Sequence, residues 1–175
     1  HGMFSPQVEL LSRFAQTIAV DLKGHGQSEC VNTLRYLDVH CQSINELMIE
    51  LNLEKAIFVG LSYGGIVTQN FAIKYPDKVK QMVLIDTYAH ILPRTLSQLP
   101  LTMFGLFIVS SALLPYKLLT PLFKQYEKWE LAHQAMIQNY RTRNRIQMMI
   151  QLIEVAGKSY LKALKKMQTP TLVVV

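Results

Sequence analysis

The first 86 residues alternate between short apolar runs and longer segments in which apolar residues recur at helical spacing. The short runs predict strands at residues 17–20, 55–59 and 79–85. Helical spacing predicts helices at residues 8–15, 34–53 and 66–75. Strands that alternate with helices indicate a parallel sheet with right-handed crossover connections. The pattern therefore predicts an α/β fold.

Residues 88–168 break this alternation, because they favour helices throughout and the strand pattern returns only at Thr171. We therefore predict a helical insertion in the sheet. Within it, residues 95–116 carry no charge, but Pro100 and Pro115 leave only 14 residues between them. A membrane-spanning helix needs about 20. Three interpretations stay open: a helix buried against the main domain, an apolar wall over a binding site, and, least favoured, a surface that dips into a membrane.

Both ends of the chain resemble cuts through a sheet. The chain starts at His1 without an initiator methionine, and residues 171–175 form an apolar, β-branched run typical of a buried strand. We therefore expect an internal segment of a longer protein, inactive and poorly soluble by itself. The predicted organisation is a core over residues 1–87, a helical cap over 88–168 and the start of the next core strand over 169–175.

Composition limits the classes of protein and of partner. With 175 residues, 50% of them hydrophobic, the chain can bury the core of one domain with an insertion. Its net charge of +6 is concentrated in residues 117–166, which is typical of a solvated helical face and can also favour anionic substrates or membrane surfaces. No motif interleaves aromatic and basic residues, so we exclude nucleic acid as a partner.

The two cysteines, Cys30 and Cys41, form neither a disulfide framework nor a metal-binding cluster. Cys41 lies among the apolar residues of a predicted helix, so we expect it to be a buried free thiol. This cysteine usage favours a cytoplasmic location. We expect no metal and no cofactor.

The strongest chemical signal is the run GLSYGG at residues 60–65, between a predicted strand and a predicted helix. G-x-S-x-G in that context is typical of a nucleophile elbow, a strained turn that projects a serine hydroxyl from the sheet edge. We expect glycine at positions 60 and 64 because strand and helix approach closely there, so that a Cβ atom on Gly60 or Gly64 would collide with the other element. The turn also places Ser62 at a helix N-terminus, which favours the negative charge of an acyl-transfer intermediate.

With this elbow, the runs HGM at 1–3, DLKGHGQS at 21–28, VLID at 83–86 and PTLVV at 170–174 stand in the order seen in α/β-hydrolases. The chain resembles the serine-nucleophile, esterase- and lipase-like branch of that superfamily. The resemblance implies parallel core strands flanked by helices, with the third to sixth strands in residues 1–87 and a helical cap inserted after the sixth. It also implies that the fold is incomplete at both ends and that the triad acid and histidine follow Val175.

The resemblance further implies roles for single residues. Ser62 would be the nucleophile, and the backbone N–H groups of Met3 and Tyr63 would bind the oxyanion. His25 would stabilise its loop rather than act as a base. Asp86 would be structural, although some relatives carry the triad acid after the sixth strand, so that this alternative stays open.

The sequence therefore predicts a serine hydrolase that cleaves a small, hydrophobic ester or related acyl substrate through an acyl-enzyme on Ser62. Haloalkane dehalogenases and epoxide hydrolases carry an aspartate at the elbow, so the serine argues against their chemistry. Three alternatives remain on the same scaffold: a carbon–carbon or amide hydrolase, an acyltransferase, and a ligand-binding member without catalysis. In each case the expected partner is a small molecule.

Overall fold

A computed structural model of the chain describes residues 4–90, 95–100, 103, 114, 130, 134, 137 and 145–175. The chain divides into two compact units, His1–Asn32 with Thr95–Met148 and Thr33–Arg94 with Met149–Val175. Met3 and most of the predicted cap at 88–168, with its uncharged run, lie outside the described residues. The predicted domain boundaries therefore stay a prediction.

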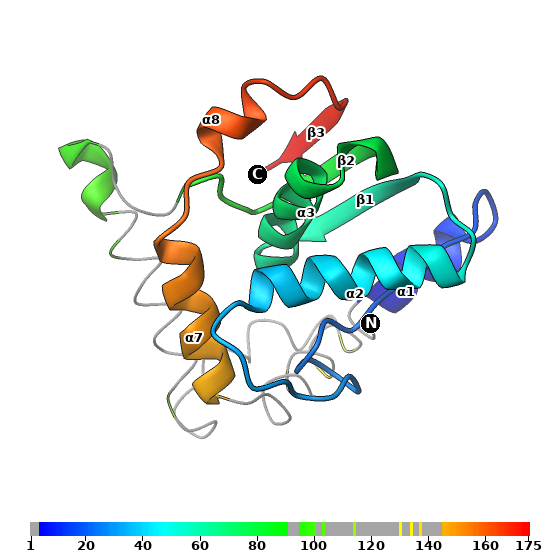
Figure 1. The fold of residues 1–175 in the computed structure, drawn as a ribbon, viewed down its shortest axis with the longest axis horizontal. Coiled ribbons are helices and arrows are strands. Elements are labelled where there is room, and N and C mark those ends of the chain that lie inside the picture. The colour runs from blue at the N-terminus through cyan, green and yellow to red at the C-terminus, as the bar shows by residue number, and fades with distance from the viewer. Residues whose placement is uncertain are drawn as a thin grey trace. The chain divides into compact units, whose positions relative to one another are not determined.

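The second unit contains a sheet of three parallel strands in the order β1-β2-β3 (Figure 1). The strands are β1 (Ala56–Leu61), β2 (Val79–Ile85) and β3 (Thr171–Val174). The prediction for residues 79–85 is confirmed residue for residue, and the other two strands differ from the predicted ranges only at their ends. The predicted α/β architecture with a parallel sheet is confirmed.

Many of the described residues outside the sheet form helices and short helical turns. They are α1 (Ser5–Leu11), α2 (Tyr36–Glu50), α3 (Tyr63–Lys74), α7 (Arg145–Ala156) and α8 (Leu161–Leu164), with 3-10 turns at η2 (Pro76–Lys78) and η3 (Leu96–Gln98). The helix predicted at 8–15 is shifted: α1 begins at Ser5, with Pro6 in its first turn, where a missing N–H costs nothing, and it ends at Leu11, so that residues 12–15 are not helical. Apolar spacing therefore located this helix, but not its ends.

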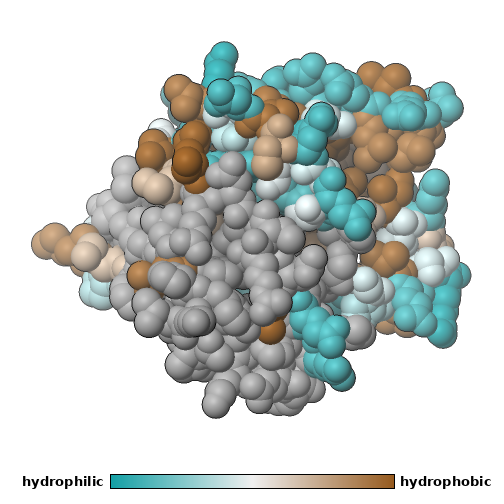
Figure 2. All heavy atoms as spheres, turned by 90° about the horizontal axis from the view of Figure 1, so that it is seen from below, coloured by the Kyte–Doolittle hydropathy of each residue, from teal (hydrophilic) through white to brown (hydrophobic). Residues whose placement is uncertain are grey.

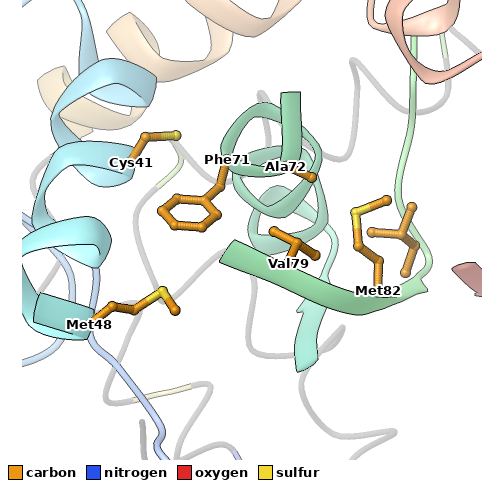
Figure 3. Packing of buried hydrophobic residues seen from close by; sticks show 7 residues of the cluster. Cys41, Met48, Phe71, Ala72, Val79 and Met82 are labelled. Carbon is orange, nitrogen blue, oxygen red and sulfur yellow. The ribbon is translucent and has the colours of Figure 1, made fainter. Parts of the chain in front are cut away.

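The hydrophobic core of this unit lies where α2 and α3 pack on one face of the sheet. Phe71 of α3 points between Cys41 and Met48 of α2, and all three side chains are buried (Figure 3). The Phe71 ring centroid lies 4.7 Å from that of Phe58 in β1. Burying one such side chain contributes about 1.5–3 kcal/mol, so this contact fixes α3 on the strand that leads into the elbow.

The predicted apolar face of α2 is largely confirmed, since Leu37, Cys41 and Met48 are buried. Leu51, which we expected on the same face, is 40% exposed because the helix ends at Glu50. The helix also buries His40 completely, which the apolar pattern did not predict.

The strand predicted at residues 17–20 is not formed. Ile18 and Val20 are each 43% exposed, and the segment has no strand pairing among the described residues. A strand exists only with a hydrogen-bonded neighbour, which a local apolar pattern does not supply. This prediction was wrong because the segment pairs with no neighbouring strand among the described residues.

Apolar side chains also reach the surface, as the brown patches in Figure 2 show for one face of the molecule. In β1, Ile57 and Val59 are each 52% exposed, whereas Phe58 between them packs against the core. Side chains alternate between the faces of a strand, so the sheet face opposite α3 is exposed and apolar. Within the described ranges, no helix combines the length and apolarity needed to cross a membrane.

Candidate active site

Ser62 alone forms the turn between β1, which ends at Leu61, and α3, which begins at Tyr63. Its φ of 51° and ψ of −116° match the first central position of a type II′ turn, where glycine is usual. For a serine such a conformation costs on the order of 1–3 kcal/mol. Ser62 is also exposed. The strand and the helix predicted to flank it are both confirmed.

Hydrogen bonds hold the backbone of Ser62 on both sides. Its N–H donates to the carbonyl oxygen of Ile85 at the end of β2, at 2.9 Å. Its carbonyl oxygen accepts from the N–H groups of Gly65 and Ile66 at 3.0 and 3.3 Å, and from the Thr87 hydroxyl at 2.7 Å. None of these four bonds uses Ser62 Oγ. The surroundings therefore fix the strained backbone without using the hydroxyl.

In the elbow run at residues 60–65, two glycines are required by close approach, but only one of them was predicted. A Cβ on Gly60 would lie 2.6 Å from the Gly64 carbonyl oxygen, which confirms the expected collision between strand and helix. The same expectation for Gly64 was wrong, because a Cβ there would meet nothing within 4 Å. The second tight position is Gly65, where a Cβ would lie 2.5 Å from Thr87 Oγ1. The helix is crowded by the segment after β2, one residue later than the motif suggested.

The N-terminal end of α3 suits a negatively charged ligand. The first N–H groups of an α-helix point away from its own carbonyl groups and carry the positive end of the helix dipole. The first turn of α3 holds no acidic residue, and Lys74 lies in its last turn. The charge pattern of α3 therefore leaves this end attractive to an anion.

The Tyr63 side chain belongs to the interior rather than to the exposed side of the turn. Burial raises the pKa of its hydroxyl well above the usual value, and the charge of Glu154 acts in the same direction. The hydroxyl therefore stays protonated at neutral pH and cannot serve as a general base. The Tyr63 ring lies edge-on to the ring of His40, with centroids 5.8 Å apart. Any direct part of Tyr63 in chemistry rests with its backbone N–H.

Sequence reasoning missed the buried polar group beside Tyr63. Glu154 of α7 accepts the N–H of Leu37, in the first turn of α2, at 3.0 Å and binds Lys158 Nζ at 3.0 Å. Its carboxylate thereby caps a helix that has no cap of its own. His40 Nε2 lies 3.4 Å from Gln151 Nε2 in the same region. No sequence signal marks the contacts between α2 and α7, because the residues that make them lie more than 100 positions apart.

The structure places two of the other residues considered from sequence, Asp86 and His25, and their roles stay predictions. Asp86 adopts a φ of 43°, and its N–H donates to the carbonyl of Val174 at 2.9 Å, joining the ends of β2 and β3. His25 Nδ1 lies 3.4 Å from the carbonyl of Lys23, within the loop where its motif places it. Met3, the other predicted oxyanion residue, lies outside the described residues. Thr87 had no place in the motif, yet it contacts Ser62 directly.

Comparison with known proteins identifies the family. A family model described as "alpha/beta hydrolase fold" matches residues 1–174. The chain is 31% identical to bifunctional epoxide hydrolase 2 of Sus scrofa over 74 residues, which are 41% of this chain and 13% of that protein. Over 68 residues, 38% of this chain, it is 38% identical to 3-oxoadipate enol-lactonase 1 of Acinetobacter baylyi, covering 24% of it. The matched part thus spans about a quarter or less of these curated relatives.

A solved structure extends the likeness to nearly the whole chain. A hydrolase from Pseudomonas aeruginosa PA01 matches 98% of this chain with a TM-score of 0.76 and 23% identity. The match covers 65% of that structure, and at this identity it concerns the fold alone. The family match, the parallel sheet and the strand–serine–helix turn agree with one another. The chain belongs to the alpha/beta hydrolase fold family.

Proposed function

We propose that the full-length protein is a serine hydrolase that cleaves a small, hydrophobic ester or related acyl substrate. Ser62 carries this proposal, because it is an exposed serine held in a conformation that glycine normally adopts. Strain of this kind persists only where the surroundings enforce it, and it clusters at catalytic turns. A purely structural turn at this place would be relieved by a glycine.

The proposed reaction has two steps. Ser62 Oγ attacks the substrate carbonyl and its hydroxyl proton passes to a base; the ester C–O bond then breaks as the base gives that proton to the leaving oxygen, which releases the alcohol. Water then attacks the acyl-enzyme, frees the carboxylic acid and restores the serine hydroxyl. The N–H groups of Tyr63 and Met3 bind the oxyanion, and loss of one such donor typically lowers the rate by about 10²–10³-fold. We place the base and its acidic partner outside these 175 residues.

The relatives support acyl chemistry unevenly. The enol-lactonase of Acinetobacter baylyi is named for opening a lactone, an internal ester. The epoxide hydrolase of Sus scrofa is similarly related, but this chain carries Ser62 where that chemistry uses an aspartate. A serine cannot provide the carboxylate oxygen that opens an epoxide, so we favour the ester or lactone.

The first test is covalent labelling of the full-length protein with a fluorophosphonate, followed by digestion and mass spectrometry. We expect one adduct, on the peptide that contains Ser62. Ser62→Ala should abolish both the adduct and the hydrolysis of short p-nitrophenyl esters. Ser43→Ala, a serine substitution within α2, should change neither.

Two results would contradict the proposal. The first is a folded wild-type protein that acquires no adduct on Ser62, as expected of a ligand-binding member of the family. The second is an adduct that persists in Ser62→Ala. The two enzymatic alternatives would preserve the labelling of Ser62. An acyltransferase would transfer the acyl group to an added second acceptor, and a carbon–carbon hydrolase would cleave a diketone.

A further inference from the structure

We propose that Thr87 is a positioning residue that orients the Tyr63 N–H toward the oxyanion. The inference rests on the function proposed above. Thr87 lies just beyond the end of β2, outside the elbow motif, and its Oγ1 donates to the carbonyl oxygen of Ser62 at 2.7 Å. That carbonyl and the Tyr63 N–H belong to one peptide group.

The rigidity of the peptide group makes this bond informative. The group is planar, and among the described residues all peptide bonds are trans, so its C=O and N–H point in opposite directions. Fixing the direction of the Ser62 carbonyl therefore fixes the direction of the Tyr63 N–H. The short hydrogen bond from Thr87 to the Ser62 carbonyl therefore restricts rotation of the whole peptide group, including the Tyr63 N–H.

The segment from Ile85 to Thr87 holds Ser62 at two points. Ile85 accepts the Ser62 N–H, and Thr87 donates to the Ser62 carbonyl. Asp86, between them, has a φ of 43°, which turns the chain after the strand. This segment therefore holds Ser62 from outside the elbow, in addition to the N–H groups of Gly65 and Ile66 that donate to the same carbonyl.

A second contact keeps this segment against the first turn of α3. Gln69 is 1% exposed, and its Nε2 donates to the carbonyls of Gly65 and Tyr88 at 3.2 and 3.0 Å. The missing Cβ of Gly65 leaves the space that the Thr87 side chain occupies. Packing and hydrogen bonding therefore both set the position of Thr87 Oγ1.

If Thr87 positions the oxyanion donor, its loss should change kcat; if its role is only structural, its loss should change only the stability of the protein. One hydrogen bond contributes about 0.5–1.5 kcal/mol to stability, wherever it lies. A displaced oxyanion donor chiefly weakens transition-state binding, which lowers kcat and leaves KM nearly unchanged. Since a donor removed outright costs about 10²–10³-fold, we expect a misdirected one to cost about 10–30-fold.

The experiment compares Thr87→Val, Thr87→Ser and Thr171→Val in the full-length protein. Thr171 is the matched control, because its Oγ1 also donates to a backbone carbonyl, that of Thr169 at 2.9 Å, but on β3. Thr87→Val should lower kcat, expressed per serine titrated with fluorophosphonate, by about 10–30-fold. Thr87→Ser, which keeps the hydroxyl, should come within about threefold of wild type, and Thr171→Val should match wild type.

Different results overturn different claims. If Thr87→Val matches wild type in kcat, if serine does not restore activity, or if Thr171→Val falls equally, Thr87 has no positioning role. If Thr87→Val does not fold, Thr87→Cys, with its weaker donor, replaces it in the same comparison. A wild-type protein that neither labels on Ser62 nor hydrolyses esters overturns the proposed function itself. Labelling of the wild type therefore separates the two failures.

Discussion

Two of the described turns that need backbone at positive φ meet that need differently. In the loop at residues 21–29, Gly24 and Gly26 adopt φ values of 77° and 53°. In the elbow and the segment that holds it, Ser62 and Asp86 adopt φ values of 51° and 43°. Glycine takes such conformations at little steric cost, whereas other residues are strained by about 1–3 kcal/mol.

The hydrogen bonds of the two turns differ in the same way. In the loop, the loop's own side chains hold its backbone: the Asp21 carboxylate accepts the Gln27 N–H at 3.1 Å, and Ser28 Oγ donates to the Asp21 carbonyl at 2.7 Å. In the elbow, the backbone of Ser62 is held at both ends and its own hydroxyl takes no part. The loop thus uses its own side chains to support its shape, whereas the elbow is held by its backbone and by Thr87 from another segment, which leaves the Ser62 hydroxyl out of these bonds.

The largest expected effect comes from replacing the strained serine by the residue its conformation suits. Ser62→Gly should reduce ester hydrolysis by about 10⁴-fold or more, because the nucleophile is lost. It should also raise the free energy of unfolding by about 1 kcal/mol, because the relieved strain outweighs the extra entropy of glycine in the unfolded chain. Hydrolysis assays and denaturant titration measure the two effects.

Ser43→Gly is the matched control for that experiment. Ser43 lies inside α2, where glycine costs about 0.5–1 kcal/mol, so the same change should have the opposite sign in stability and leave hydrolysis intact. If Ser62→Gly destabilised the protein as Ser43→Gly does, Ser62 would not be strained. The contrast between the two turns would then disappear.

The elbow also shows which features could be predicted from the sequence and which could not. The strand before Ser62 and the helix after it follow from local patterns of spacing and glycine, so both could be predicted. The collision at Gly60 follows from the motif, whereas the crowding of Gly65 depends on Thr87, which comes from a separate strand end. A contact made by two segments that meet only in the folded chain leaves no local signal.

The wrong strand at residues 17–20 illustrates the same limit. Its apolar run met the local requirement for a strand, but strand structure is a property of a pair. Glu154, which caps α2 from α7, is a third case, since its partner Leu37 lies 117 positions earlier. Most helices and strands could be predicted here from local pattern; the contacts that pair a strand, cap α2 or hold Ser62 could not.

A medium effect is expected in the relaxed loop. Gly26→Ala would force alanine to a φ of 53° and bring its Cβ against the Asp21 carboxyl group. The left-handed conformation alone costs about 1–2 kcal/mol, so the free energy of unfolding should fall by at least that amount. Hydrolysis per titrated serine should stay within about threefold of wild type if the loop supports shape rather than chemistry.

Gly157→Ala serves as its control, because a Cβ there meets only ordinary contacts at 3.7 and 3.8 Å. Its stability should change by about 0.5 kcal/mol or less. A Gly26→Ala protein that is as stable as wild type but has lost its hydrolysis would assign the loop a catalytic part. It would thereby remove the distinction drawn between the two turns.

The smallest effect is expected at Asp86, the second strained position. Asparagine tolerates positive φ as aspartate does, so Asp86→Asn should change the free energy of unfolding by no more than about 0.5 kcal/mol. If Asp86 only turns the chain, hydrolysis should stay within about threefold, whereas loss of a triad carboxylate lowers kcat by about 10⁴-fold. Asp86→Val should destabilise by about 1–2 kcal/mol, because a β-branched residue resists this φ. A large loss of kcat in Asp86→Asn with unchanged stability would make Asp86 the triad acid, and its strain would then serve chemistry directly, like that of Ser62.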